Sequence, residues 1–443
     1  MVRLRGRRVP GVVIRTDVPA GTSQAILPVL SQSDKPLPTS YVKWLTLVAD
    51  WYGLPLSPTV AQLASNLNGR YLIDNTMLCK NGQQHLWLTP ADTTPLGQYL
   101  QTRAETIPLS QTERRQQWQR AAAGCDLKIV GTTAAVCLPF SQLKEITLEA
   151  PLASPYYSDR SPGCQTAVLA SLLAQAHDCR LVLRTSIPLN QLRLRLPLPE
   201  RTVIQQPHYH PIEVIPQKDR GRLNDDLVGT LKRALKDKQR VLVYHNHLPG
   251  VASDGRPIGL TQLATRLSSA LEQTVGVVTA RAELPDTPVV VATATSLYRL
   301  TDHFDLIVVP DVDGLASANQ PWSHLAALDA LGTLASRAPL IAQGRDMSSA
   351  LNQALVAQLD PTRLADLNWP TFSSRLLKLQ LKSELTLPAD WAVIQQNGTD
   401  QYVQAPRVLK PLERTWLADA RALGKVWSDE WTWPPISDTV VQQ

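Results

Sequence analysis

Cysteine motifs that bind zinc or cycle between thiol and disulfide are missing from this sequence of 443 residues. The five cysteines contain no CxxC pair, which excludes zinc ribbons and redox dithiols. An odd number of cysteines also argues against a complete set of disulfides. We therefore expect buried free thiols and no zinc cofactor. The five residues are Cys79, Cys125, Cys137, Cys164 and Cys179.

Long apolar runs are also absent. No stretch approaches the roughly 18–20 apolar residues of a membrane span. The basic amino end, MVRLRGRRVPG, is not followed by an apolar region of the length that a secretory signal needs. Glycine is modest at 21 residues against 34 prolines, which argues against several glycine-rich phosphate loops. These absences predict a soluble, cytoplasmic protein with no membrane partner.

The composition that is present is typical of a folded, basic protein. Apolar residues make up 44% of the chain and charged residues 19%, and the length predicts two or three domains. The net charge of +6 permits a polyanionic partner without requiring one. Basic residues near the amino end fit either a solvated edge strand or a phosphate-contacting surface. They are Arg3, Arg5, Arg7, Arg8 and Arg15.

Strand-like and helix-like segments alternate from residue 84 onward. Apolar runs such as QHLWLTP, LKEITLEA, RVLVYHNH and FDLIVVPDVDG indicate strands, and QTAVLASLLAQAHD between them indicates a helix. This alternation predicts an α/β fold with parallel sheets in two similar lobes, 84–200 and 228–345. A proline- and charge-rich connection, 200–226, joins them. Helical spacing in 40–67 predicts that Trp44 and Trp51 pack into a core rather than stack on bases.

Catalytic motifs are scarce. EITLEAPLASP, residues 145–155, is an apolar strand that ends in one carboxylate, Glu149, where a motor ATPase would carry an acidic pair for Mg²⁺ and the attacking water. No GxxxxGK[ST] phosphate loop is present, because the single Gly–Lys pair, at 424–425, is followed by Val426. The His-x-His pairs 208/210 and 245/247 lack a third ligand, and Asp311 and Asp313 fit a strand-end turn or helix cap better than a metal site.

The order of segments resembles the bacterial primosomal protein N′ (PriA) family of replication-restart 3′–5′ DNA helicases. RRVPGVVIRT, AILPVL and LPTSYVKWLTLVADWYGLPLSPTV are similar to the end of the family's 3′-DNA-end-binding domain and the helix after it. ERRQQWQRAAAGCDLKIVGTTAAVCLPFSQLKEITLEA resembles the first motor lobe, and SPYYSDRSPGCQTAVLASLLAQAHDCRLVLRTSIP its continuation. LVGTLKRALKDKQRVLVYHNHLPG resembles the start of the second lobe. LADLNWPTFSSRLLKLQL is similar to GYPPFSRLALL, which opens the family's carboxy-terminal domain.

The departures from the family fall on its nucleotide-contacting motifs. The phosphate loop belongs between LASNLNGRYLID and QHLWLTP, where the chain is too short to hold it. The acidic DEEH motif falls on 149–152, so that Glu149 is followed by Ala150. In the arginine-finger motif Arg337 is kept and the final arginine is replaced by Leu340. The arginine of the GTR motif falls on Thr133. The GSATP motif falls on 184–188, and the GTQM motif falls on 292–295. The zinc-binding insertion of the family is missing.

The resemblance implies two RecA-like lobes with parallel sheets, a small amino-terminal β and helical DNA-binding remnant, and a carboxy-terminal α+β domain. The expected domains are 1–40 for the remnant of the 3′-DNA-end-binding domain and 41–80 for a helical, winged-helix-like remnant. The first lobe is expected at 81–200, the second at 201–355 and the carboxy-terminal domain at 356–443.

The resemblance further implies a protein that binds single-stranded or forked DNA in replication or replication restart. Other primosome or replication proteins are expected partners. Because the degenerate catalytic positions, Glu149, Ala150 and Arg337, do not complete a site, we expect no ATPase or helicase activity and no ATP or Mg²⁺ cofactor. The alternatives are a divergent ATP-dependent 3′–5′ helicase and an interaction scaffold that no longer binds DNA. The expected DNA contacts are the amino-terminal arginines together with Lys232, Arg233, Lys236 and Lys238, whose alternative is a solvated helix face.

Overall fold

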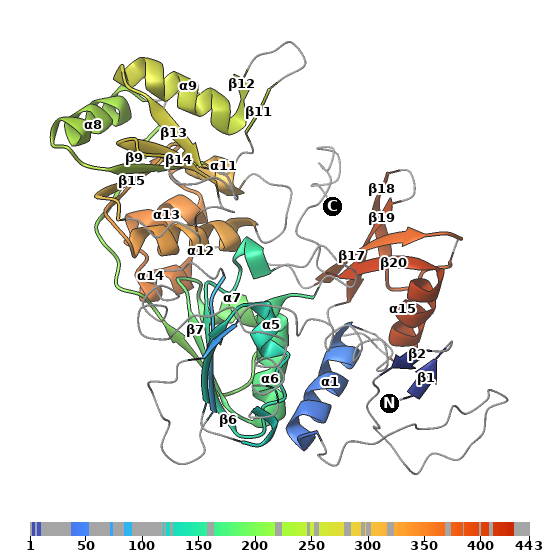
Figure 1. The fold of residues 1–443 in the computed structure, drawn as a ribbon. Helices are drawn as coiled ribbons and strands as arrows, with labels where there is room; N and C mark the ends of the chain where they lie inside the picture. Colours follow the sequence, from blue (N-terminus) through green and yellow to red (C-terminus); the bar gives the residue numbers. More distant parts are fainter. Residues whose placement is uncertain are drawn as a thin grey trace.

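Two six-stranded sheets organise the chain in this computed structural model (Figure 1). The structure describes residues 2–4, 7–9, 37–52, 71–73, 84–90, 118, 121–124, 127–156, 164–217, 224–245, 249–251, 257–278, 285–293, 297, 303–316, 323–367, 374–383, 385–397, 400–406 and 411–428. The predicted helix that follows strand 84–88 lies outside these residues. Arg5, Arg15, Cys79, Cys125 and the tail after Ser428 lie outside them as well.

The first sheet forms the core of lobe 1. Its strand order is β3 (Tyr71–Ile73), β5 (Leu127–Gly131), β4 (Gln84–Leu88), β6 (Leu143–Glu149), β7 (Arg180–Arg184) and β8 (Thr202–Gln205). Only β3 runs antiparallel to its neighbour, and every other pair is parallel. Within the described residues, the connections between these strands contain α5 (Thr133–Val136), the 3₁₀ turn η2 (Ser154–Tyr156), α6 (Thr166–His177) and α7 (Leu189–Arg193).

The second sheet forms the core of lobe 2, and all of its strand pairs are parallel. Its order is β13 (Val275–Val278), β14 (Val289–Ala292), β10 (Val241–Tyr244), β15 (Leu306–Val309), β16 (Leu340–Gly344) and β9 (Ile212–Pro216). The central strands VVVA, VLVY and LIVV are buried throughout, as expected for parallel strands covered on both faces. The predicted α/β class with two parallel-sheet lobes is thus confirmed.

The helices of lobe 2 lie on both faces of its sheet (Figure 1). They are α8 (Asp225–Lys236), α9 (Gly259–Leu271), α11 (Val312–Ala316), α12 (Ser323–Ala335), α13 (Ala350–Val356) and α14 (Pro361–Asp366). A short hairpin of β11 (Pro249–Val251) and β12 (Pro257–Ile258) precedes α9. The helices α8 and α9 cover one face of the sheet and share an apolar core with it.

The connection predicted over 200–226 contains two strands that the sequence pattern does not reveal. β8 completes the first sheet, and β9 joins the second sheet beside β16. Both are edge strands, and the IEVIP strand ends in Pro216. Proline is tolerated at a sheet edge, where a missing N–H breaks no ladder, so the prolines of this segment do not exclude strands. Lobe 2 therefore begins at β9, inside the segment predicted as a connection.

Helix α1 (Thr39–Tyr52) packs against α6 of lobe 1. The Trp44 side chain is fully buried, and its indole N–H donates to the Leu169 carbonyl oxygen at 3.0 Å. The Tyr41 hydroxyl donates to the Cys137 carbonyl at 3.0 Å, and the Gln165 amide donates to the Tyr52 hydroxyl at 3.0 Å. The core position predicted for Trp44 is confirmed. These contacts attach α1 to lobe 1, whereas the predicted domain boundaries stay predictions.

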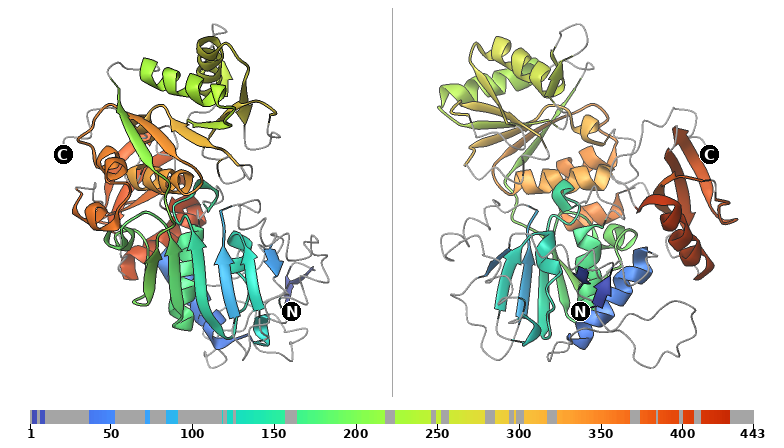
Figure 2. Two further views of the ribbon diagram at one scale, coloured as in Figure 1. Left: turned by 90° about the vertical axis from the view of Figure 1, so that its left-hand side faces the viewer. Right: turned by 45° about the vertical axis from the view of Figure 1, so that its right-hand side comes forward.

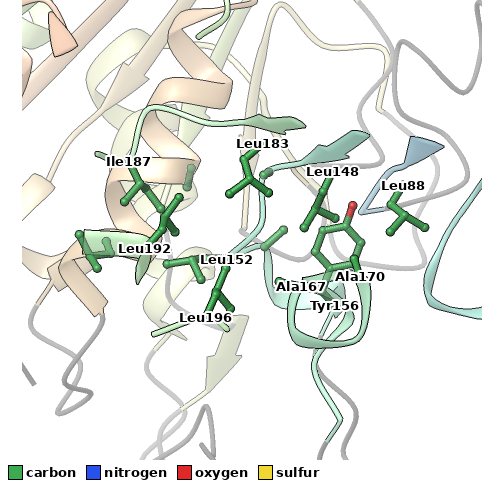
Figure 3. Packing of buried hydrophobic residues seen from close by; sticks show 14 of the residues in the cluster. Leu88, Leu148, Leu152, Tyr156, Ala167, Ala170, Leu183, Ile187, Leu192 and Leu196 are labelled. Atoms are coloured by element: carbon green, nitrogen blue, oxygen red, sulfur yellow. The ribbon is translucent and has the colours of Figure 1, made fainter. Parts of the chain in front are cut away.

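The largest apolar core extends from α1 and the first sheet to the α12, α13 and α14 side of lobe 2. Figure 3 shows one part of it, in which Leu152, Ile187, Leu192 and Leu196 lie together beyond the ends of the first-lobe strands. Both lobes thus contribute side chains to one continuous cluster. Cys137, Cys164 and Cys179 are buried and free, as predicted.

The carboxy-terminal domain is a four-stranded antiparallel sheet with one helix. Its strand order is β18 (Ala392–Asn397), β19 (Asp400–Pro406), β17 (Ser374–Leu381) and β20 (Gly424–Ser428), and α15 (Pro411–Leu423) contacts β17 and β20. At the other end of the chain β1 (Val2–Leu4) and β2 (Arg7–Val9) form a hairpin. Within the described part of the chain, no helix is long and apolar enough to span a membrane.

Candidate functional site

Three parallel strands of lobe 1 end at one edge of the sheet. β4, β6 and β7 are neighbours, and their last residues bring Trp87, Glu149 and Arg184 to that edge. The register pairs Glu149 with Arg184 across β6 and β7. Because ligands of open α/β sheets bind beyond the carboxyl ends of the strands, this edge is the candidate site.

The carboxylate of Glu149 is held by an arginine of the same sheet. Arg184 Nη1 donates to Glu149 Oε1 at 2.8 Å, and the Arg184 guanidinium carbon lies 5.5 Å from the centroid of the Trp87 ring. The Glu149 side chain is only 19% exposed. Burial raises the pKa of Glu149, while the guanidinium groups of Arg184 and Arg337 oppose that rise. The end of β7 thus places a cation, Arg184, against the Glu149 carboxylate at the end of β6.

Ala150 adopts a left-handed backbone conformation immediately after Glu149. Its φ is 44°, a value that few non-glycine residues adopt. The Ala150 amide donates to the Arg184 carbonyl at 3.0 Å, and its own carbonyl accepts from the Ala153 amide at 2.8 Å. The turn therefore places a buried methyl group where the family resemblance puts a second acid.

Arg337, which follows α12 in lobe 2, reaches the same region. Arg337 Nη1 donates to the Leu297 carbonyl at 2.9 Å, and its charge acts on Glu149 of lobe 1. Arg337 of lobe 2 is thus near enough to Glu149 of lobe 1 to act on its pKa. The Glu149 carboxylate therefore lies in a region of positive charge, with Arg184 hydrogen-bonded to it. The predicted equivalence of Glu149, Ala150 and Arg337 to catalytic positions stays a prediction.

The turn after β4, rather than the segment before it, adjoins the Glu149 strand. β4 lies between β5 and β6 and is parallel to both, so its following residues Thr89 and Pro90 emerge at the carboxyl edge. The segment ahead of QHLWLTP, where the resemblance predicts the phosphate loop, follows β3, which runs antiparallel to β5 and so ends at the opposite edge of the sheet. At the edge where β6 ends, the segment after β4 fits the strand-to-helix order of such a loop better. That segment reads TPADTTPLGQ and contains no Gly–Lys–Ser/Thr sequence.

The other motif positions have structural partners. Thr133 and Thr166 share a hydrogen bond between their hydroxyl oxygens. Thr185 and Ser186, from the segment 184–188, contact residues of α12 in lobe 2. The Ala292 carbonyl accepts from the His245 amide at 3.0 Å. Each of these positions thus has a hydrogen-bond partner within the fold.

The predicted DNA contacts lie in two separate places. Lys232, Arg233 and Lys236 are exposed on α8, and Lys238 follows the helix and is exposed as well. Arg3, Arg7 and Arg8 belong to the β1–β2 hairpin, whose register pairs Arg3 with Arg8. Helix α8 and the hairpin lie at opposite ends of the molecule (Figures 1 and 2). The structure does not bring the two basic groups together.

The residues considered for metal binding have other roles. Asp311 Oδ1 accepts from the Gly314 amide at 2.9 Å, and Asp313 Oδ2 accepts from the Arg345 amide at 2.6 Å. Asp311 thus accepts from the first turn of α11, which is the helix-cap alternative of the prediction, whereas Asp313 links α11 to the residue after β16. The His208 and His210 rings lie 6.3 Å apart, edge to face, and His247 lies outside the described residues. Over the residues that the structure describes, no three His, Cys, Asp or Glu side chains are placed to bind a metal.

The roles of two residues of this region, Arg184 and Asp329, are not predicted from the sequence. Arg184 reads as the polar end of an apolar strand, and only the register between β6 and β7 shows that it faces Glu149. Asp329 is fully buried on α12, where it contacts lobe 1. A signal for Asp329 does exist in the sequence, because it is the one carboxylate in the otherwise apolar helix SHLAALDALGTLA.

Comparison with known proteins gives only distant likenesses. No model of a protein family and no curated protein matches the chain. Among solved structures, the chain is similar to the E. coli DExH-box NTPase HrpB, with 14% identity, a TM-score of 0.31, and coverage of 77% of this chain and 48% of that chain. It is also similar to RecG bound to a three-way DNA junction, with 10% identity, a TM-score of 0.35, and coverage of 64% and 39%.

A further similar structure is the DUF1998 helicase MrfA bound to DNA and AMPPNP, with 13% identity, a TM-score of 0.34, and coverage of 70% of this chain and 46% of that chain. The chain thus spans half or less of the length of these three proteins: 48%, 39% and 46%. The α/β assignment rests on the sheet pairing of the chain itself.

Proposed function

We propose that this chain is a PriA-like protein that binds single-stranded or forked DNA in replication or replication restart, without ATPase or helicase activity. The observation that carries the proposal is the ion pair between Arg184 and Glu149 at 2.8 Å. It occupies the strand end at which a motor ATPase holds Mg²⁺. The family assignment is supported by the order of its sequence segments along the chain.

The absence of hydrolysis follows from what the strand end can and cannot do. Mg²⁺ binds through carboxylates and phosphate oxygens and keeps near-octahedral geometry. Glu149 is already engaged by a guanidinium, and Ala150 has no group that can accept a proton from water. An arginine finger is worth roughly 10³–10⁵ in rate only when metal and water are in place. Arg337 alone therefore supplies no turnover.

DNA contact is proposed for the exposed basic face of α8 and for the β1–β2 hairpin. The helix buries Leu227, Leu231 and Ala234 against lobe 2, which leaves Lys232, Arg233 and Lys236 facing outward. In the hairpin, like-charged residues occupy paired positions. Like charges opposite one another destabilise a strand pair, and a bound phosphate relieves their repulsion.

The test measures ATP hydrolysis and DNA binding on one preparation. We expect a labelled fork to bind in fluorescence anisotropy at low salt, and we expect ATP turnover to stay at background with and without the fork. ATP turnover that rises when the fork is added would contradict the proposed lack of activity and favour a divergent helicase. No binding at micromolar protein would favour the interaction scaffold.

A charge-matched pair of variants locates the contact. Changing Lys232, Arg233 and Lys236 to glutamine should weaken binding and reduce the steepness of log K against log salt by about 2, since each lost phosphate contact on a single strand contributes about 0.7. The control removes the same charge from exposed residues elsewhere and should leave the slope unchanged. The control residues are Lys144, Arg193 and Arg363.

One observation favours the scaffold alternative. Helix α8 begins with Asp225 and Asp226 and carries Arg233 and Lys236 in its last turn. This distribution complements the helix dipole and stabilises the helix without any partner. If the two triple variants bind the fork equally, the charges of α8 serve the helix, and the DNA contact lies outside α8.

A further inference from the structure

Helix α12 of lobe 2 packs against the loops that follow β6 and β7 of lobe 1. The carboxylate of Asp329, 1% exposed, accepts from the Thr185 hydroxyl at 2.5 Å and from the Leu152 amide at 3.1 Å. The Thr185 hydroxyl in turn accepts from the Ile187 amide at 3.1 Å. One side chain of lobe 2 thus orders two separate loops of lobe 1.

A second contact lies beside the first on the same helix. The Ser186 hydroxyl, buried and next in sequence to Thr185, donates to the Leu328 carbonyl at 3.1 Å. One turn further, Gly332 faces the same serine, and a Cβ added at Gly332 would overlap Ser186 Oγ and lie 2.9 Å from Ser186 Cβ. Glycine inside a helix costs about 1 kcal/mol relative to alanine. The close approach of the two lobes explains why a glycine occupies this position.

Apolar side chains surround these polar contacts. Leu152 and Ile187 from lobe 1 belong to the same buried cluster as Leu325, Leu328 and Leu331 of α12. Figure 1 shows α12 lying directly against the strand ends of lobe 1. Domains that close around a substrate must separate again to release the product, which requires an interface that can open. Here the interface is continuous with the core.

We propose that Asp329, Thr185, Ser186 and Gly332 form an interlobe latch that holds the two lobes as one closed body. A buried carboxylate contributes little net stability but favours one geometry, because any displacement of the lobes leaves its oxygens without hydrogen-bond donors. The latch thereby fixes the relative orientation of the lobes. It depends on the interface alone and does not require the proposed binding of DNA.

The charge of the latch makes it sensitive to pH. Burial raises the pKa of Asp329 to about 7, against the lowering effects of the Thr185 hydroxyl and the Leu152 amide. Tyr209, from the segment between the lobes, has a pKa raised to about 12 by burial and is neutral in this range. His324, on α12 itself, has a pKa lowered by burial, which favours its neutral form. Within the described residues no cationic side chain acts on the pKa of Asp329, so the latch should loosen as the pH rises from 6 to 8.

Hydrogen exchange read by mass spectrometry tests the latch. In Asp329→Ala, we expect exchange at least about tenfold faster in peptides over residues 150–156 and 184–188, since a lost buried hydrogen bond is worth one to two decades in opening. Peptides over β10 and β17 serve as internal controls and should keep their rates. After correction for the pH dependence of the intrinsic exchange rate, raising the pH from 6 to 8 should also speed exchange in these two loops of the wild type.

A second pair of variants tests the close approach of the two lobes at Gly332 and Ser186, independently of Asp329. Gly332→Ala should speed exchange in the same two loops, and adding Ser186→Gly should restore slow exchange, because it removes both atoms that the new methyl group would meet. If Asp329→Ala fails to fold, this pair carries the test. The proposal is overturned if the single variants leave both loops at wild-type rates. It is equally overturned if exchange rises uniformly over all peptides, which would make the contacts part of global folding.

Discussion

Replacing Asp329 with asparagine should change how the stability of the folded chain depends on pH. The side chain is fully buried, and burial raises the pKa of its carboxyl from 3.8 to about 7. Asparagine preserves the shape, and its amide can accept from the Leu152 amide and donate to the Thr185 hydroxyl, which are the two partners of the carboxylate. The substitution therefore removes the titration while keeping the contacts.

The sign follows from proton linkage. Between pH 4 and pH 7 the folded state holds a proton on Asp329 that the unfolded state has released. The contribution of this proton to stability is complete below pH 4 and is lost as the pH rises to about 7. A difference of about 3 in pKa corresponds to about 4 kcal/mol. The asparagine variant should thus gain up to about 4 kcal/mol relative to the wild type between pH 4 and pH 8.

The measurement compares urea unfolding of the two proteins, followed by tryptophan fluorescence, at several pH values. Because a chain of this size unfolds in more than one step, the quantity of interest is the difference in midpoint between variant and wild type at each pH. Every other titrating group cancels in that difference. A difference that stays flat from pH 4 to pH 8 would refute the assignment of a buried, raised-pKa carboxyl to Asp329.

His177 provides a control of opposite sign. Burial lowers the pKa of this side chain from 6.5 to about 4, with a smaller contribution from Lys43. The folded state therefore binds fewer protons than the unfolded state in that window, and the contribution to stability is lost as the pH falls from 6.5 to 4. In His177→Gln the midpoint difference from the wild type should grow toward low pH, whereas in the Asp329 variant it grows toward high pH.

Three further predictions follow from the strand-end site and the α1 packing. Ala150→Gly should raise the stability of the folded chain by about 1 kcal/mol, because glycine adopts a φ of 44° without strain. The control Ala170→Gly, in the buried part of α6, should lower stability, and the midpoint of thermal unfolding distinguishes the two variants. Trp44→Phe should cost about 1–3 kcal/mol, since it removes a buried indole and its hydrogen bond, and a midpoint equal to wild type would contradict the docking of α1. A double-mutant cycle of Glu149→Gln and Arg184→Gln should give a coupling of about 1–2 kcal/mol with no change in ATP turnover, and strict additivity would count against the ion pair.

Much of the architecture is predictable because parallel strands leave a strong sequence signal. Runs such as RVLVYHNH and FDLIVVPDVDG become the fully buried strands β10 and β15, whose apolar side chains face helices on both sides. The edge strands β8 and β9 carry half-exposed residues and lie among prolines, so the same signal fails there. Periodicity predicts how a segment is buried, and it predicts less where burial is partial.

The site is less predictable because it depends on contacts between distant segments. The resemblance equates Glu149, Ala150 and Arg337 with catalytic positions, and the structure puts Arg337 near enough to Glu149 to act on its pKa. The cation that faces Glu149 is set by the register of β6 against β7, which no local pattern encodes. Asp329 and its partner Thr185 are 144 residues apart. A buried carboxylate in an apolar helix signals that a partner exists without saying which one.

The ion pair at the end of β6 shows why a strand of this kind can keep its acid without a metal. A carboxylate buried at a strand end needs a positive partner, since taking it out of water alone costs several kcal/mol. In a motor ATPase the metal supplies that charge only while nucleotide is bound. Arg184 supplies it permanently, because a guanidinium stays protonated and can donate to a carboxylate oxygen in fixed geometry. The chain itself therefore supplies the positive partner that the buried Glu149 carboxylate needs.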